Sequence, residues 1–184
     1  MDLKELVSAQ RRYWNSGATR SVGFRRDMLE KLERAVVSRE RELLSALRED
    51  LGKAPYESYA CEVGMTLAEL RCAKSHLARW TAPKGRPSPM ALFPAKSRVV
   101  ADPYGVALIM SPWNYPVQLT LVPLISALAA GNCAVVKPSA YAPACSAVLK
   151  ALISDIFPRE YAAVVEGGRA ENSALLEERF DYIF

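Results

Sequence analysis

The chain has few residues that bind metals or form disulfides. Among its 184 residues are one histidine and four cysteines, and no two cysteines form a Cys-x-x-Cys pair. Structural zinc sites need Cys and His ligands at short, paired spacings, so this pattern argues against a metal centre. We expect all the cysteines to be reduced and to behave as small buried hydrophobic residues. They are Cys61, Cys72, Cys133 and Cys145.

Long apolar runs and an export signal are missing as well. Charged residues begin at Asp2, so no apolar segment of a secretory signal opens the chain. The longest apolar stretch, residues 119–134, is interrupted by Pro123, Ser126 and Asn132 and is too short to cross a bilayer. We therefore predict a cytoplasmic protein without a membrane span.

A strong excess of charge of one sign is also absent. The net charge is +4, and basic and acidic residues interleave along the first 80 positions instead of forming a basic stripe. This balance predicts an ordinary solvated surface and no nucleic-acid partner. Hydrophobic residues make up 51% of the chain, which is enough for a sizeable core.

Residues 1–80 have the pattern of an N-terminal helical part. Apolar side chains recur at helical spacing in successive segments, which gives each segment one buried face. Ser38 suits the N-cap of one helix, and Gly52 suits the end of that helix. A longer helix is expected over residues 57–80, with His76 on its surface.

Residues 81–103 differ from the segments on both sides. Five prolines exclude a continuous helix, and Arg98–Ala101 has the composition of an extended segment. We predict a connector that carries one strand.

Over residues 104–184, short apolar runs alternate with helical patterns. The expected strands cover residues 106–110, 134–136, 162–165 and 182–184, and the expected helices cover residues 117–130, 143–157 and 170–179. A βαβαβαβ order predicts a right-handed, parallel, doubly wound sheet. The predicted fold class is therefore α/β, with N-terminal helices followed by a partial sheet whose pattern looks interrupted at Phe184.

Open parallel sheets bind ligands beyond the carboxyl ends of their strands. Those ends are followed here by Ser111–Pro116, Lys137–Ser139 and Glu166–Gly168, which bring an amide, an ammonium group and two glycines to one edge. The usual Gly-x-Gly-x-x-Gly fingerprint and the Walker A loop are both missing. The pattern thus predicts a ligand crevice without naming the ligand.

Six short motifs follow one another along this part of the chain. They are Pro103–Val106, Pro112–Pro116, Ala129–Asn132, Val136–Ser139, Val165–Gly168 and Arg179–Phe184. In order and spacing they resemble the aldehyde dehydrogenase superfamily, and the last two are similar to its class 3 branch. The resemblance covers essentially the whole chain. It implies that residues 104–184 form the Rossmann-like half of a cofactor domain.

The resemblance implies a reaction and a role for Asn114. In this family a cysteine thiolate attacks an aldehyde, the thiohemiacetal passes hydride to a nicotinamide, and a glutamate helps water to cleave the thioester. Asn114 matches the asparagine whose side-chain N–H stabilises the oxyanion. From spacing alone, an N-cap for the following helix is an equal alternative.

The resemblance also implies a site for NAD or NADP. The matching residues are Met110, Ser111, Pro112, Trp113, Lys137, Ser139, Gly167 and Gly168. Lys137 matches a lysine that contacts the adenosine ribose, with a lysine that merely closes a strand as the alternative. Gly167 and Gly168 match a turn near the adenine, with an ordinary loop as the alternative. Many relatives hold the ribose hydroxyls with a glutamate where this chain has Ala140, so we expect NADP to be tolerated better here.

The family's nucleophile and general base have no counterpart in the chain. None of its cysteines stands in the sequence context of that nucleophile, so we expect the 184-residue chain alone to be inactive. The intact enzyme is expected to oxidise an aldehyde to a carboxylic acid. The resemblance further implies a homodimer, with Arg98–Ala101 in the oligomerisation region.

Two other functions stay open from the sequence alone. One is a non-catalytic, truncated nucleotide-binding or protein-interaction module, whose last strand pairs with a partner chain. The other is a basic amphipathic-helix protein that visits membranes or nucleic acid, which the salt dependence of binding would reveal.

Overall fold

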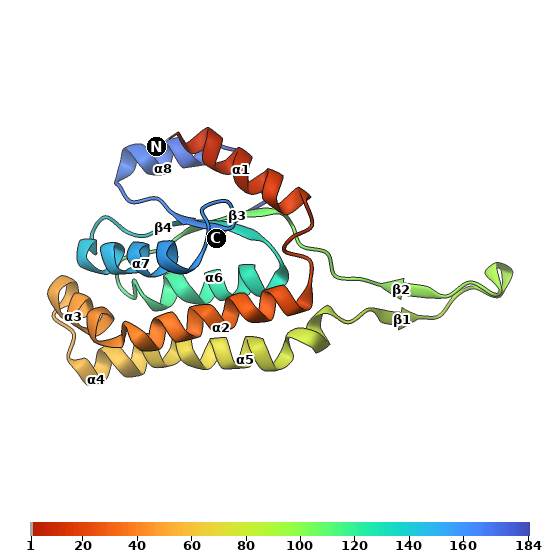
Figure 1. Cartoon of the computed structure of the whole chain (residues 1–184), viewed down its shortest axis with the longest axis horizontal. Coiled ribbons are helices and arrows are strands. Elements are labelled where there is room, and N and C mark those ends of the chain that lie inside the picture. Colours follow the sequence, from red (N-terminus) through yellow and green to blue (C-terminus); the bar gives the residue numbers. More distant parts are fainter. Residues whose placement is uncertain (1) are drawn as a thin grey trace.

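The central sheet is parallel and has four strands in the order β5-β4-β3-β6 (Figure 1). In the computed structural model, which describes residues 2–184, the strands are β3 (Val106–Met110), β4 (Cys133–Lys137), β5 (Ala162–Val164) and β6 (Tyr182–Ile183). The chain moves outward from β3 through β4 to β5 and then returns to place β6 on the other side of β3. This reversal defines a doubly wound sheet and confirms the predicted fold class.

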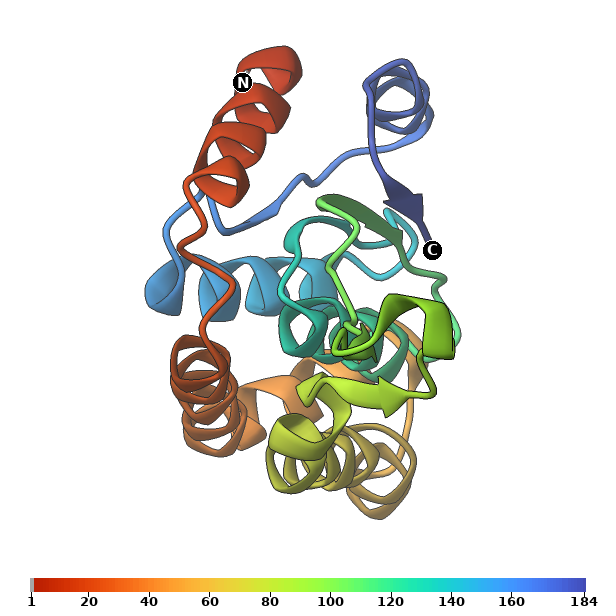
Figure 2. The same ribbon diagram turned by 90° about the vertical axis from the view of Figure 1, so that its right-hand side faces the viewer.

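Helices cover both faces of the sheet. The helices that connect its strands are α6 (Gln118–Ala130), α7 (Pro143–Ile156) and α8 (Arg169–Leu176). α6 and α7 lie on one face, and α8 shares the other face with α1 (Leu3–Asn15), as Figures 1 and 2 show from two directions. β3 and β4 are buried along almost their whole length, as expected for parallel strands that are covered on both faces.

The other N-terminal helices form a further layer outside α6 and α7. They are α2 (Val22–Ser38), α3 (Glu40–Leu51), α4 (Pro55–Ser58) and α5 (Gly64–Thr81), with a π-helical turn, η1 (Tyr59–Val63), between the last two. α2 and α5 pack against α6, and α3 packs against α7. One apolar core therefore joins these helices to the sheet. No helix within residues 2–184 combines the length and the apolar character that crossing a membrane requires.

The boundary between α2 and α3 differs from the prediction at Ser38. α2 continues through Ser38, whose hydroxyl donates a hydrogen bond to the carbonyl of Ala35 at 3.0 Å. The residue at the N-cap of α3 is Arg39, which makes no side-chain capping bond. The carbonyl of Ala35 also accepts a hydrogen bond from the backbone N–H of Arg39 at 3.0 Å, so the Ser38 hydroxyl bonds back within α2 instead of capping the next helix. Gly52 ends α3 as predicted, with a left-handed φ of 67°.

Two cysteines contradict the expectation that all four are buried. Cys133 and Cys145 are buried, but Cys61 and Cys72 are exposed. The buried face of α5 repeats at helical spacing and includes Ala73, so the neighbouring Cys72 points away from the core. Cys61 lies in η1, where the wider turn changes which side chains face inward.

The connector is a hairpin and not a single strand. β1 (Lys84–Arg86) and β2 (Ser97–Val99) pair antiparallel, and a short 3-10 helix, η2 (Met90–Leu92), lies near the tip. The hairpin projects from the body of the protein as an arm (Figure 1). The first strand was missed because Lys84–Arg86 contains no apolar residue and is exposed throughout.

Candidate cofactor and oxyanion site

The loops that carry the predicted site residues begin side by side. Met110 and Lys137 are register partners at the carboxyl ends of β3 and β4, and the backbone N–H of Ser111 donates to the carbonyl of Lys137 at 3.1 Å. β6 lies on the other side of β3, so the strand order reverses at this point. Crevices beyond such a reversal are where open α/β sheets bind ligands.

Ser111 and Trp113 have different surroundings within the loop after β3. Ser111 is buried, and its hydroxyl accepts a hydrogen bond from Thr120 Oγ1 at 2.7 Å. This bond ties the start of the loop to α6. Pro112 and the half-exposed Trp113 follow at the surface. The structure therefore leaves Trp113 accessible to a ligand and turns the Ser111 side chain inward.

Asn114 is exposed and does not cap the following helix. The N-cap residue of α6 is Val117, whose side chain makes no capping hydrogen bond. Among residues 2–184 the side-chain amide of Asn114 has no hydrogen-bond partner. Its backbone carbonyl accepts a hydrogen bond from Lys53 Nζ at 2.9 Å. The amide is therefore accessible at the carboxyl edge of the sheet.

Glu62 performs the capping that the sequence suggested for Asn114. One of its carboxylate oxygens, Oε2, accepts from the backbone N–H of Val117 at 2.8 Å and of Gln118 at 3.3 Å. The other oxygen, Oε1, pairs with Lys53 Nζ at 2.5 Å. A carboxylate at a helix N-terminus satisfies free N–H groups and interacts favourably with the helix dipole.

A second carboxylate holds the start of α7 in the same way. The two oxygens of Asp50 accept from the backbone N–H groups of Ala144 at 3.1 Å and Cys145 at 2.7 Å. The N-termini of α6 and α7 are thus both satisfied from within the protein. Sequence reasoning missed Asp50, Lys53 and Glu62 because bonds to distant backbone groups leave no local motif.

Lys137 is buried, and its ammonium group has more N–H donors than the hydrogen bond to Pro138 uses. It ends β4, is 3% exposed, and Nζ donates to the carbonyl of Pro138 at 2.7 Å. Burial lowers the pKa of Lys137, and the nearby Glu171 carboxylate opposes that shift. An ammonium group has three N–H donors, so Nζ keeps two donors beyond the bond to Pro138.

The loop after β5 completes the same edge of the sheet. Gly168 donates its backbone N–H to Glu171 Oε2 at 2.7 Å, and hydrogen bonds from the backbone N–H groups of Glu171 itself and of Gly168 lower the pKa of Glu171. Gly167 has a left-handed φ of 137°, and a Cβ there would lie 2.4 Å from the Glu171 side chain. The left-handed backbone conformation therefore favours glycine at 167 independently of any ligand. Ser139 binds locally, accepting from the backbone N–H of Tyr141 at 3.2 Å.

Neither buried cysteine has the surroundings of an activated nucleophile. Burial raises the pKa of Cys133 to about 12 and also raises the pKa of Cys145, so both are thiols at neutral pH. Cys72 lies on α5 beside His76, which stacks on Trp80 with ring centroids 5.5 Å apart. Within residues 2–184, no three His, Cys, Asp or Glu side chains are grouped to hold a metal ion.

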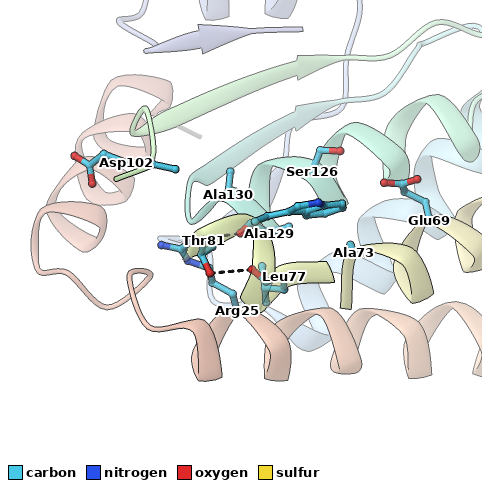
Figure 3. A pocket seen from close by; sticks show the side chains of 11 residues that line it. Arg25, Glu69, Ala73, Leu77, Thr81, Asp102, Ser126, Ala129 and Ala130 are labelled. Carbon is cyan, nitrogen blue, oxygen red and sulfur yellow. Dashed lines mark hydrogen bonds between the residues drawn. The ribbon is translucent and has the colours of Figure 1, made fainter. Parts of the chain in front are cut away.

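A cavity of about 260 Å³ lies away from these loops, at the other end of α6 (Figure 3). Arg25, Leu77, Thr81 and Asp102 are among the residues that line it. None of the predicted site residues contributes to it. The predicted crevice and this cavity are therefore different places in the fold.

These features define a class of protein. A doubly wound parallel sheet presents three loops, with a buried lysine and an accessible amide, at the edge where open α/β sheets bind ligands. The model of the Aldehyde dehydrogenase family matches residues 1–183, and the chain belongs to that family.

Known relatives agree with this assignment. The chain is 44% identical over 172 residues to 4,4'-diaponeurosporen-aldehyde dehydrogenase of Staphylococcus aureus, covering 94% of this chain and 38% of that protein. It is 40% identical over 183 residues to Aldehyde dehydrogenase family 3 member H1 of Arabidopsis thaliana, covering 100% of this chain and 38% of that protein. Class 3 enzymes are thus among its relatives.

A solved structure shows the same fold. The substrate-bound state of Staphylococcus aureus AldH matches with a TM-score of 0.96 and 40% identity, over 100% of this chain and 40% of that one. The chain therefore spans about two fifths of the length of these relatives. It corresponds to their N-terminal part, and the helical layer and partial sheet belong to their cofactor-binding region.

Proposed function

We propose that the chain is the N-terminal part of an NAD(P)-dependent aldehyde dehydrogenase in which Asn114 donates to the oxyanion. The observation that carries this is the position of Asn114, whose side chain is exposed at the carboxyl edge of the sheet while a lysine holds its backbone carbonyl. A fixed neutral donor stabilises a charge that develops on the aldehyde oxygen, and it needs no change of protonation.

The chain would bind and orient the nucleotide and the aldehyde. The remaining part of the enzyme would supply the nucleophile and the general base. The bound nicotinamide would accept hydride. Lys137 offers N–H donors to a ribose, and Trp113, in the loop after the neighbouring strand β3, offers an exposed aromatic surface. The nucleophile and the general base are proposed to lie outside this chain, so the chain alone should not oxidise aldehydes.

The choice between NAD and NADP belongs to this proposal. Ala140 is exposed, directly after Ser139, and carries no charge that would repel a 2′-phosphate. We therefore include both nucleotides. A homodimer is likewise part of the proposal, supported by the exposed apolar side chains of the arm, and a cytoplasmic location stays a prediction from the sequence.

A chimeric enzyme tests the proposal directly. Residues 1–184 would replace the matching segment of Staphylococcus aureus AldH, and oxidation of hexanal would be followed through reduced NAD or NADP. We expect Asn114→Ala to lower kcat by on the order of 10²–10³ with little change in Tm, because the side chain is exposed.

Asn15→Ala is the matched control, since Asn15 is an exposed asparagine at the end of α1 and should be silent. The 184-residue chain alone, assayed in parallel, should give no turnover. Full activity of the Asn114→Ala chimera would contradict the proposal.

One observation favours a second candidate, a protein-interaction module. Tyr182 and Ile183 of the edge strand β6 and the following Phe184 are each about half exposed, and this edge offers a place for strand addition. An inactive parent chimera together with a stable complex between the chain and a partner strand would favour this alternative.

A further inference from the structure

A buried ion pair lies directly beneath the Asn114 loop. Lys53 follows α3, and Glu62 lies in the π-helical turn η1; their Nζ and Oε1 atoms are 2.5 Å apart. The Glu62 side chain is 0% exposed and the Lys53 side chain 11%. Two charges so removed from water are costly unless further hydrogen bonds satisfy them.

Those further bonds go to the loop that carries Asn114 and to the start of α6. Lys53 Nζ donates to the Asn114 carbonyl at 2.9 Å and lies 4.1 Å from the centroid of the Tyr115 ring. Glu62 Oε2 accepts from the N–H of Val117 at 2.8 Å and of Gln118 at 3.3 Å. The pair therefore binds the backbone at residue 114 and again at the first turn of α6.

The π-helical turn explains how Glu62 reaches this position. The wider turn of η1 places one extra residue between α4 and α5 without unwinding either helix. Glu62 can then face the start of α6 while α5 keeps its own apolar face against that helix. Thr66 Oγ1 donates to the Glu62 carbonyl at 2.9 Å, which satisfies a backbone acceptor in the turn.

We infer that Glu62 and Lys53 are positioning residues that aim the side-chain amide of Asn114. The direction of a side chain follows from the backbone that carries it, and this pair holds the backbone at Asn114 itself and again three and four residues further on, at Val117 and Gln118. A misplacement of about 1 Å in an active site can cost on the order of 10² in rate. The inference rests on the proposed role of Asn114 and extends it to two residues that touch no reacting atom.

The first experiment measures hydrogen exchange of the backbone amides at the start of α6, in the full 184-residue chain. Glu62→Gln should increase hydrogen exchange at the amides of Val117 and Gln118 by at least tenfold, because the neutral amide is a weaker acceptor beside Lys53. Glu33→Gln is the control, since Glu33 pairs with Lys74 between α2 and α5 and does not contact the loop. If hydrogen exchange at Val117 is unchanged in Glu62→Gln, Glu62 does not hold the backbone at the start of α6, and the inference is wrong.

The second experiment is a double-mutant cycle in the chimeric enzyme. Glu62→Gln should lower kcat roughly 10- to 100-fold and leave the KM for the nucleotide unchanged. In the Asn114→Ala background the same substitution should change kcat less than twofold, because its effect passes through Asn114. A merely structural role would lower activity equally in both backgrounds.

The outcomes separate the inference from the proposed function. If Asn114→Ala has no effect on an active chimera, the proposed function fails. If Asn114→Ala slows the enzyme and Glu62→Gln slows it further by the same factor, only the positioning role fails. Should Glu62→Gln not fold, Lys53→Met combined with Glu62→Gln removes both charges and gives the same cycle without an unpaired buried lysine.

Discussion

At the scale of single residues, the exposed amide of Asn114 lies in a loop that two buried charges hold, Lys53 and Glu62. Asn114 and Lys137 stand in short motifs directly after strands, so their position at one edge could be predicted. Lys53 and Glu62 are far from Asn114 in the sequence and act on backbone groups, which have no residue-specific pattern. Their roles depend on contacts that only the folded chain brings together.

The cysteines provide a test at this scale. In the native chain, a thiol reagent at pH 8 should modify Cys61 and Cys72 rapidly, because both are exposed. Cys133 and Cys145 should react only after unfolding, since both are buried and burial raises the pKa of each thiol, for Cys133 to about 12.

Mass spectrometry of the labelled protein, with and without denaturant, distinguishes the two pairs. The variant with Cys61→Ser and Cys72→Ser should take up no label in the native state. Rapid native labelling of Cys133 would show that the sheet is not packed as described.

At the scale of elements, helix ends marked by glycine were predictable and the π-helical turn was not. Gly52 and Gly131 both end helices in the left-handed conformation, which glycine adopts without strain. The η1 turn has no such marker, because its residues could equally continue an α-helix. Packing of Glu62 against α6 and of α5 against the core selects the wider turn instead.

The two glycines also separate backbone strain from steric contact. A Cβ at Gly52 (φ 67°) would meet nothing within 4 Å, whereas at Gly131 (φ 93°) it would lie 2.6 Å from the Arg25 guanidinium. We expect Gly52→Ala to lower the free energy of unfolding by about 1–2 kcal/mol through strain alone.

Gly131→Ala should cost about 1–3 kcal/mol more, because it displaces a buried arginine. Arg25 donates to the carbonyl of Thr19 at 2.8 Å and to that of Ala129 at 3.4 Å. Urea unfolding of both variants measures the difference. If both variants lose the same free energy of unfolding, the Arg25 side chain can move away from the added Cβ without cost.

At the scale of the whole molecule, the arm is the part least attached to the rest. It extends from the body in Figure 1, and Met90, Leu92 and Phe93 near its tip are exposed. Exposed apolar residues gathered on one projection are typical of an interface, and not of a surface that faces solvent. This supports the proposed homodimer.

Replacing both Leu92 and Phe93 by Asp should convert a dimer of the chimeric enzyme into a monomer, because the charges cannot be buried at an apolar interface. Sedimentation velocity measures the change. Val37→Asp, which alters an exposed apolar residue on α2, is the control and should leave the oligomeric state unchanged. A double variant that still sediments as a dimer would place the interface elsewhere.

The sequence by itself determined the α/β class, the order of strands and helices over residues 104–184 and the loops that bear Asn114 and Lys137, because apolar periodicity and turn residues act locally. The tertiary structure alone decided that Glu62 caps α6, that Cys61 and Cys72 face outward and that the connector is a hairpin. Those outcomes depend on which distant surfaces meet, and in particular on a buried carboxylate finding free N–H groups more than fifty residues away.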